Sequence, residues 1–136
     1  MPVDVPDLQY QEACVVQAAA YYQANPDLIR AVIRTEGGKS GQVKWNKDGS
    51  FDMGPMQINS VHLPELSKYG ITRDMLVNNY ACLNIYIGTY LLQKNIMTSA
   101  DFWHGVGKYH SATPSLNIAY QYRVWGNLIQ NGRVRQ

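Results

Sequence analysis

The sequence predicts a single α+β domain that is mostly helical, and three observations support this prediction. The chain has 136 residues, enough for one hydrophobic core and too few for two. With 46% hydrophobic and 16% charged residues, its composition is typical of a globular protein. Apolar residues recur at helical spacing through most of the chain, but residues 39–55 lose this period. We expect one domain over residues 1–136, with flexible ends at residues 1–6 and 131–136.

Two helices are predicted before residue 37. Asp7 is the expected N-cap of the first, which keeps an apolar stripe to about Tyr22. Asn25 and Pro26 have the residue types that favour an N-cap and a first helical position, so they predict the start of the second. The buried stripe of this second helix is formed by Ile29, Val32 and Ile33.

Glu36 falls on the same buried stripe, because it lies four residues after Val32 and three after Ile33. A carboxyl held against apolar surface has a raised pKa, which a general acid for a glycosidic oxygen needs. A structural ion pair is the alternative, and for Glu36 alone it is the simpler explanation. Gly37 and Gly38 end the helix and, without side chains, leave room for a substrate to reach the carboxyl. The two glycines therefore favour a catalytic Glu36.

A β-hairpin is predicted where the helical period is lost. Asp48-Gly49 is a turn signal between the short runs 43–46 and 50–53. Turn chemistry explains Asp48, whereas Asp52 lies on the second strand of the hairpin without such an explanation. If the fold brings Asp52 opposite Glu36, the two carboxyls form the pair that breaks a glycosidic bond. Otherwise Asp52 is an ordinary residue on the solvent side of a strand.

Further helices are predicted after the hairpin. Residues 57–66 form a short helix or an irregular turn, broken by Pro64, and Thr72 caps a short helix that ends near Val77. A longer helix is expected from about Tyr80 to Gln93, with Gly88 and Thr89 where another helix approaches.

The last two helices complete the prediction. Asp101 caps a short segment over residues 102–109, and the final helix runs over residues 114–130 until Asn131-Gly132 end it. Four apolar residues of the final helix share one face: Ile118, Tyr122, Trp125 and Ile129.

Polar residues near the two carboxyls have the chemistry to hold a sugar. Gln57 and Asn59 carry amides, which donate and accept hydrogen bonds as sugar hydroxyls and acetamido groups require, although turn capping explains them as well. The segment Tyr109-His110-Ser111 closes a predicted helix, and the hydroxyl of Tyr109 can orient a substrate or Glu36.

Charge and motif content disfavour several classes of function. The formal net charge is +2 with scattered Lys and Arg, so we expect no nucleic-acid partner, and no run of eighteen apolar residues predicts a membrane span. His62, His104 and His110 lack metal-ligand spacing, and the chain has no phosphate loop or serine-nucleophile motif. We expect no metal, no cofactor and a monomer.

Cys14 and Cys82 leave two possibilities open. In an oxidising compartment they form one disulfide, and in the cytosol they are buried thiols. The opening residues Met1-Pro2-Val3-Asp4 form neither a charged nor an apolar leader. We interpret this as a secretory signal that was never present or that is missing from this sequence.

Taken in order, these motifs resemble family 1 (Slt-type) lytic transglycosylases, in particular the small specialised ones of secretion, conjugation and pilus machines. The resemblance covers most of the chain from Leu8 to Trp125, and its ordered set is more specific than any single motif. The matching segments are residues 31–38, 52–59, 82–85 and 109–114. Residues 46–60 also resemble C-type lysozyme. The resemblance implies a lysozyme-like fold of the goose and Slt type with a small β-hairpin.

The resemblance also implies a reaction on peptidoglycan strands. Glu36 protonates the glycosidic oxygen between N-acetylmuramic acid and N-acetylglucosamine and then deprotonates the muramyl C6 hydroxyl, which closes a 1,6-anhydro ring. Asp52, which many lytic transglycosylases lack, stabilises the oxocarbenium charge or acts as a nucleophile. The residues implied to hold the sugar are Gln57, Asn59, Tyr109 and Ser111.

Location and partners follow from the same resemblance. It favours a disulfide between Cys14 and Cys82, a periplasmic location and work for a secretion, conjugation or pilus apparatus. Two alternatives stay open: a muramidase that uses water on the same scaffold, and a glycan-binding scaffold subunit with weak or no activity.

Overall fold

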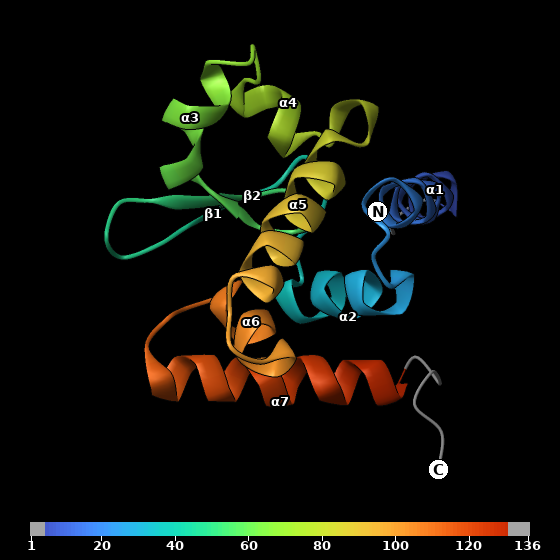
Figure 1. The fold of residues 1–136 in the computed structure, drawn as a ribbon. Coiled ribbons are helices and arrows are strands. Elements are labelled where there is room, and N and C mark those ends of the chain that lie inside the picture. Colours follow the sequence, from blue (N-terminus) through green and yellow to red (C-terminus); the bar gives the residue numbers. More distant parts are fainter. Residues whose placement is uncertain (1–4, 131–136) are drawn as a thin grey trace.

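A computed structural model describes the backbone of residues 5–130 and the side chains of residues 7–130, most of them in helices (Figure 1). Residues 1–4 and 131–136, with the helix end predicted at Asn131-Gly132, lie outside the described residues. The helices in chain order are α1 (Val5–Tyr22), α2 (Pro26–Glu36), α3 (Leu63–Ser67), α4 (Arg73–Val77), α5 (Leu83–Met97), α6 (Phe102–Lys108) and α7 (Pro114–Gln130). Two 3-10 helices, η1 (Ser60–His62) and η2 (Tyr80–Cys82), precede α3 and α5.

Local capping signals place the ends of several helices. Asn25 accepts a hydrogen bond from the backbone N–H of Asp27 at 2.8 Å, which confirms it as the N-cap of α2. Thr72 and Asp101 cap α4 and α6 in the same way, as predicted. The prediction for Asp7 is wrong: α1 begins at Val5, inside the segment expected to be flexible. Asp7 lies in the first turn, where its charge favours the helix dipole.

The predicted hairpin is part of a three-stranded antiparallel sheet in the order β1-β2-β3. Strands β1 (Val43–Trp45) and β2 (Phe51–Met53) pair as expected, but β3 (Ile58–Asn59) replaces the short helix or turn predicted there. Pro64 does not break a helix, because it lies in the first turn of α3. Backbone N–H groups in the first turn have no hydrogen-bond partner within the helix, so a proline there costs no helical hydrogen bond. Asp52 lies on the central strand, with Lys44 and Asn59 as its cross-strand partners.

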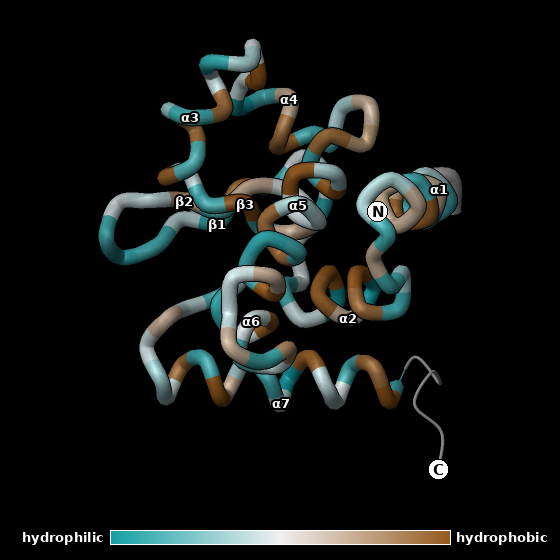
Figure 2. Tube along the Cα trace, viewed as in Figure 1, coloured by the Kyte–Doolittle hydropathy of each residue, from teal (hydrophilic) through white to brown (hydrophobic). Residues whose placement is uncertain are grey.

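The core lies where α2, α5 and the sheet meet. In Figure 1, α5 runs through the middle of the molecule, α1 and α2 lie on one side of it, and α7 lies below α2 and α6. Hydrophobic segments recur along α2, α5 and α7, whereas the hairpin is largely hydrophilic (Figure 2). Fully buried side chains of the core include Ile29 on α2, Met53 on β2, Met56 in the turn after β2, Ile85 on α5 and Tyr120 on α7. No helix in the described part of the chain is both long and apolar enough for a bilayer crossing.

The central helix begins later than predicted and continues further. Asn79, Ala81 and Cys82 have positive φ angles of 51°, 50° and 65°, a conformation that breaks a helix, so α5 starts at Leu83 and ends at Met97. A helix was predicted to approach α5 at Gly88 and Thr89, but the close neighbour at Gly88 is a side chain from a turn. A Cβ at Gly88 would meet the side chain of Met56, which reaches α5 from the turn after β2.

The apolar face predicted for α7 is exposed. Ile118, Tyr122, Trp125 and Ile129 retain 52%, 73%, 40% and 40% of their accessible surface. A neighbouring face of the same helix packs on α2 and α6 instead. The buried residues of that neighbouring face are Asn117, Tyr120, Val124 and Leu128.

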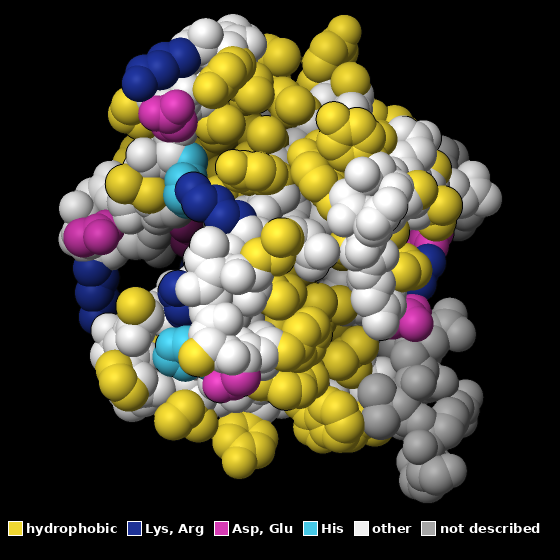
Figure 3. Space-filling model, in the orientation of Figure 1, with side chains coloured by type: hydrophobic (Ala, Val, Ile, Leu, Met, Phe, Trp, Pro, Cys, Tyr) yellow, Lys and Arg dark blue, Asp and Glu magenta, His cyan; other side chains and the backbone are white. Residues whose placement is uncertain are grey.

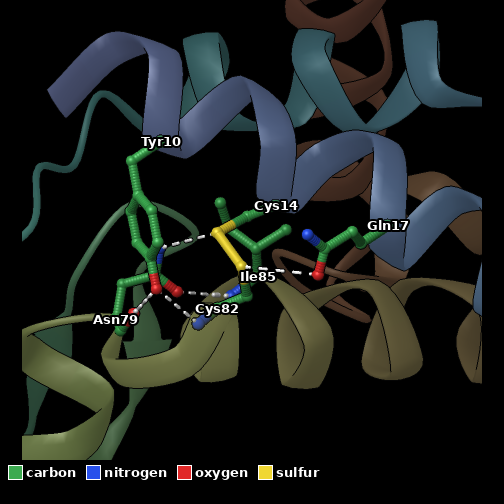
Figure 4. The surroundings of a disulfide bond; sticks show 6 residues. All are labelled: Tyr10, Cys14, Gln17, Asn79, Cys82 and Ile85. Carbon is green, nitrogen blue, oxygen red and sulfur yellow. Dashed lines mark hydrogen bonds between the residues drawn. A yellow bond between two sulfur atoms is a disulfide. The ribbon is translucent and has the colours of Figure 1, made fainter. Parts of the chain in front are cut away.

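Cys14 on α1 and Cys82 at the end of η2 form a disulfide, with their Cα atoms 5.2 Å apart (Figure 4). This confirms the pairing that the resemblance implied. Tyr10 and Asn79 support the same junction. The hydroxyl of Tyr10 accepts a hydrogen bond from the N–H of Cys82 at 3.0 Å, and the buried side chain of Asn79 accepts one from the N–H of Ile85 at 3.2 Å.

Candidate active site

A groove of about 560 Å³ separates the sheet from α5 and the α6–α7 loop. Figure 3 shows the molecule hollowed between the hairpin and that loop. Both predicted catalytic carboxyls line this groove, together with three of the four residues predicted to hold a sugar. These five residues are Glu36, Asp52, Gln57, Asn59 and Tyr109.

Glu36 has the electrostatics of a general acid. It forms the last residue of α2, and burial raises its pKa from 4.5 to about 7. The negative charge of Asp52 raises this pKa further, while a hydrogen bond from Tyr120 and the charges of Arg123 and Lys44 lower it. At neutral pH a carboxyl with this pKa is about half protonated. Glu36 can therefore both give and take a proton.

Tyr120 is the functional residue that the sequence analysis missed. Its hydroxyl donates a hydrogen bond of 2.6 Å to Oε2 of Glu36, and only 1% of its surface is exposed. The ring of His110 stacks on it at 5.1 Å, and the guanidinium of Arg123 lies 5.3 Å from its centroid. Asn117, Tyr120, Val124 and Leu128 recur at helical spacing, but a neighbouring face of α7 is more apolar, so the sequence alone does not single out Tyr120.

Asp52 is held in place by two amides. Asn59 donates to Oδ1 of Asp52 at 2.9 Å, and Asn46 donates to Oδ2 at 3.2 Å. The oxygen of the Asn59 side chain accepts from the N–H of Val61 at 2.9 Å. Both ends of this amide are therefore engaged within the protein, and Asn59 acts on the groove through the orientation of Asp52. Cross-strand pairing produces this arrangement, because Asn59 lies opposite Asp52 in the sheet.

A buried asparagine fixes the turn that carries Gln57. Asn84 accepts a hydrogen bond from the N–H of Met56 at 2.9 Å and donates to the carbonyl oxygens of Met53 and Leu76 at 2.7 and 3.0 Å. Gln57 itself has a positive φ of 54° and donates from Nε2 to the carbonyl of Gly54 at 3.0 Å. The oxygen of the Gln57 amide has no hydrogen-bond partner among the described residues, and Gln57 lines the groove.

The two glycines after Glu36 have different roles. Gly37 has a φ of 71° and ends α2 by donating to the carbonyl of Ile33 at 2.9 Å, and a Cβ there would meet nothing within 4 Å. Gly37 thus leaves the approach to Glu36 open, as expected. A Cβ at Gly38 would instead collide with the carbonyl oxygen of Gly54 and lie 2.6 Å from Nε2 of Gln57. Position 38 therefore requires a glycine, because the turn that contains Gly54 and Gln57 packs against it.

Tyr109 and Ser111 differ in their relation to the groove. Tyr109 lines it, and its hydroxyl donates to the carbonyl of Met56 at 2.7 Å. Burial raises the pKa of Tyr109 well above its ordinary value, so it stays protonated. Ser111 is not among the residues that line the groove, and its hydroxyl accepts from the N–H of Thr113 at 3.0 Å. That contact caps a turn, and the predicted sugar contact of Ser111 gains no support from it.

The charged and sulfur-bearing residues of the described chain form no metal centre. No group of three or more His, Cys, Asp or Glu side chains with the geometry of a metal site occurs between the described ends of the protein. The groove is lined by three carboxyls, several amides, two imidazoles, the phenol of Tyr109 and the amine of Lys108.

Comparison with known proteins identifies the family. Residues 13–125 match the family described as Transglycosylase SLT domain. The invasion protein IagB of Salmonella typhimurium is 30% identical over 119 residues, which cover 84% of this chain and 74% of IagB. Protein IpgF of Shigella flexneri is 32% identical over 101 residues, covering 74% of this chain and 66% of IpgF. A peptidoglycan-binding-like protein of Escherichia coli O157:H7 is 37% identical over 107 residues, covering 73% and 64% of the two chains.

The architecture agrees with this match. A mostly helical chain with a small antiparallel sheet, and a glutamate at the end of a core helix facing that sheet, is the lysozyme-like fold that the resemblance implied. The match includes Glu36, Asp52, Tyr109 and Tyr120, and so takes in the whole groove. This chain belongs to the transglycosylase SLT domain family.

Proposed function

We propose that this protein is a lytic transglycosylase that cleaves the β-1,4 bond between N-acetylmuramic acid and N-acetylglucosamine in peptidoglycan. The observation that carries the proposal is the state of Glu36, which lines the groove with a pKa raised to about 7. A carboxyl of this kind protonates a leaving oxygen at neutral pH. Membership of the transglycosylase SLT domain family supports the same assignment.

The proposed reaction has two proton transfers, both at Glu36. In the first, Glu36 gives its proton to the glycosidic oxygen, the bond from this oxygen to the muramyl C1 breaks, and N-acetylglucosamine leaves with a hydroxyl. Tyr120 already donates to Oε2, which leaves Oε1 for the transferred proton. In the second, ionised Glu36 takes the proton of the muramyl C6 hydroxyl, whose oxygen bonds to C1. The high effective molarity of this internal hydroxyl removes the need for water.

Hydrolysis by a muramidase mechanism is the second candidate, and the environment of Asp52 favours it. Asn46 and Asn59 orient the Asp52 carboxylate in the same groove as Glu36. A carboxylate held in this way either stabilises positive charge at C1 or attacks C1 to form a glycosyl-enzyme that water then hydrolyses. In both mechanisms we assign Gln57 and Tyr109 to the sugar bound over Asp52.

Mass spectrometry of digested sacculi tests the proposal. The unmodified protein should release products with 1,6-anhydro ends, and Glu36→Gln should release none. Products with reducing ends would instead identify a muramidase. Asp52→Asn separates the mechanisms, because a transglycosylase retains activity without this carboxylate and a double-displacement hydrolase loses it. Binding of sacculi by the unmodified protein without any cleavage would identify a glycan-binding scaffold.

We also propose where the cleavage takes place. The names of two relatives, an invasion protein and a peptidoglycan-binding-like protein, support work in the periplasm that opens the wall for a secretion, conjugation or pilus machine. The disulfide supports an oxidising compartment. Fractionation of cells producing the protein from its natural gene tests the location, and recovery from the cytosolic fraction alone would contradict it.

A further inference from the structure

Two further cavities lie beside the active-site groove, and neighbouring cavities share lining residues. Glu36 lies at a junction, because it lines the groove that holds Asp52 and also a smaller cavity, which Asp52 does not line and which the segments 36–38 and 42–44 border. Gly37, Gly38 and Gln42 line this smaller cavity and also a hollow of about 710 Å³ between α1, α2 and the loop after α2. We call this hollow, bounded by Leu8, Val15, Ile33, Arg34, Lys39 and Gln42, the α1–α2 groove.

The positions of Asp52 and Glu36 define which way the glycan strand runs through the proposed site. In the proposed reaction the muramyl residue that reacts at C1 lies over Asp52, and the N-acetylglucosamine that leaves lies on the other side of Glu36. The two sugars alternate along a glycan strand, so the next residue beyond that N-acetylglucosamine is again muramyl. This residue carries a peptide on its lactyl group. The path from Glu36 past Gly37 into the α1–α2 groove therefore leads away from the cleaved bond on the side of that peptide.

The α1–α2 groove has an apolar floor and two cations at its rim. Val15 and Ile33 form the floor and are 1% and 7% exposed. Arg34 donates to the side-chain oxygen of Gln130 at 3.3 Å, and neither Arg34 nor Lys39 forms an ion pair with a carboxylate of the described residues.

Arg30, which lines the same groove, is different. Its guanidinium bonds to the carboxylates of Glu12 and Asp27, so its charge is already neutralised. Arg34 and Lys39 are thus the cations of this groove that remain to attract a ligand. Asp7 also lines the groove, and it forms no ion pair with the described residues. A short peptide with more carboxylates than amines fits this balance of charge.

We propose that the α1–α2 groove binds the acidic peptide of the muramyl residue two sugars beyond the cleaved bond, through its carboxylates, with Arg34 and Lys39. This inference rests on the proposed function, because that function defines which sugar lies over Asp52. The peptide's small side chains lie on the floor formed by Val15 and Ile33, and the absence of a side chain at Gly37 leaves its path open. The protein therefore discriminates in favour of strands that still carry peptides.

The test compares two substrates that differ only in the peptide. One is uncrosslinked glycan strands with their peptides, and the other is the same strands after an amidase has removed them. The unmodified protein should have a higher kcat/KM on the strands with peptides. In Arg34→Gln/Lys39→Gln this preference should fall about tenfold, which is the loss expected for hydrogen bonds to charged groups. Raising the salt concentration should lower the preference as well.

Lys68→Gln is the matched control. It also removes an exposed positive charge, but Lys68 pairs with Glu65 at 3.3 Å outside the α1–α2 groove, so it should keep the full preference. If Arg34→Gln/Lys39→Gln does not fold, Lys39→Gln alone tests the inference, since Lys39 lies in an exposed loop and should show a smaller drop of the same sign.

The outcomes separate the peptide site from the proposed function. A preference unchanged in Arg34→Gln/Lys39→Gln, or an equal loss on both substrates, would overturn the peptide site while cleavage by Glu36 stands. If the unmodified protein cleaves neither substrate, the proposed function fails and the peptide site fails with it.

Discussion

Glu36 meets two opposing requirements, since a carboxyl must be buried enough to keep its proton and open enough to reach a substrate. Its position at the last turn of α2 meets both, because the apolar stripe of the helix covers one side and Gly37 exposes the other. The hydrogen bond from Tyr120 lowers the pKa of Glu36 against the rise caused by burial. The result is a pKa of about 7, at which both protonation states exist at neutral pH.

Burial of Glu36 predicts that the protein becomes less stable as the pH rises. Its pKa is about 7 in the folded protein and about 4.5 in the unfolded chain, so the folded state binds the proton more tightly. The stability that this gives is present in full below about pH 4.5 and is lost as the pH rises through about 7. Above about pH 8 the loss in free energy of unfolding approaches 3 kcal/mol, because each unit of pKa difference corresponds to about 1.4 kcal/mol. Urea unfolding of the unmodified protein and Glu36→Gln from acidic to alkaline pH measures it.

Glu36→Gln should not show this loss, and should exceed the unmodified protein in stability at alkaline pH. Glu65→Gln is the control, since Glu65 is exposed. Among the described residues its ion-pair partner is Lys68, which is also exposed. The pH dependence of Glu65→Gln should match that of the unmodified protein. Parallel curves for the unmodified protein and Glu36→Gln would show that Glu36 is not buried as described.

At the scale of elements, the turn after β2 depends on a close contact with the end of α2. Gly38→Ala should destabilise the protein by about 2 kcal/mol or more, because the new Cβ meets the backbone carbonyl of Gly54, which cannot rotate away. Activity should fall with it, since Gln57 follows that turn. Thermal or urea unfolding and cleavage of sacculi measure the two effects.

Gly126→Ala is the control for that substitution. A Cβ at Gly126 meets nothing within 4 Å, and alanine favours a helix interior over glycine by about 1 kcal/mol, so α7 should gain stability. If Gly38→Ala were as stable as Gly126→Ala, the packing of Gly38 on Gly54 would be disproved.

The elements that sequence predicted well are those with local signals. Caps at Asn25, Thr72 and Asp101 are set by one side chain and an N–H a few residues away, so α2, α4 and α6 begin where expected. Strand β3 has no such signal, because two residues form it only by pairing with β2. The buried face of α7 was also beyond prediction, since it depends on where α2 and α6 lie.

The same distinction holds for the site. Helix phase and the two glycines that follow it predict a catalytic Glu36, and these signals are local. Asp52 is a candidate only if the fold brings it near Glu36, and both carboxyls line the same groove. Tyr120 is 84 residues from Glu36 in the chain, and its hydrogen bond exists only because α2 and α7 pack together. Asn84 likewise joins the turn after β2 from 28 residues away. Residues that position a site from distant elements carry no mark in a single sequence that separates them from ordinary core residues.

At the scale of the whole molecule, the disulfide closes a loop that contains most of the groove. Cys14 and Cys82 are 68 residues apart, and both Glu36 and Asp52 lie between them. The bond ties α1 to the segment before α5, where three residues have left-handed backbone conformations that an untied chain disfavours. It therefore stabilises the start of α5 and the docking of α1 together.

Reduction of this disulfide should lower the free energy of unfolding by about 4 kcal/mol, since a loop of this length restricts the unfolded chain by that amount. Urea unfolding with and without a thiol reductant measures the change. The dependence of the free energy of unfolding on urea concentration should become slightly steeper on reduction, because the reduced unfolded chain exposes more surface. Cys14→Ala/Cys82→Ala controls for effects of the reductant, and its midpoint should not respond to it. Because α1 supplies Val15 to the floor of the α1–α2 groove, the reduced protein should also lose its preference for peptide-bearing strands before it loses cleavage. Equal midpoints for the oxidised and reduced protein would mean that packing alone holds α1 in place.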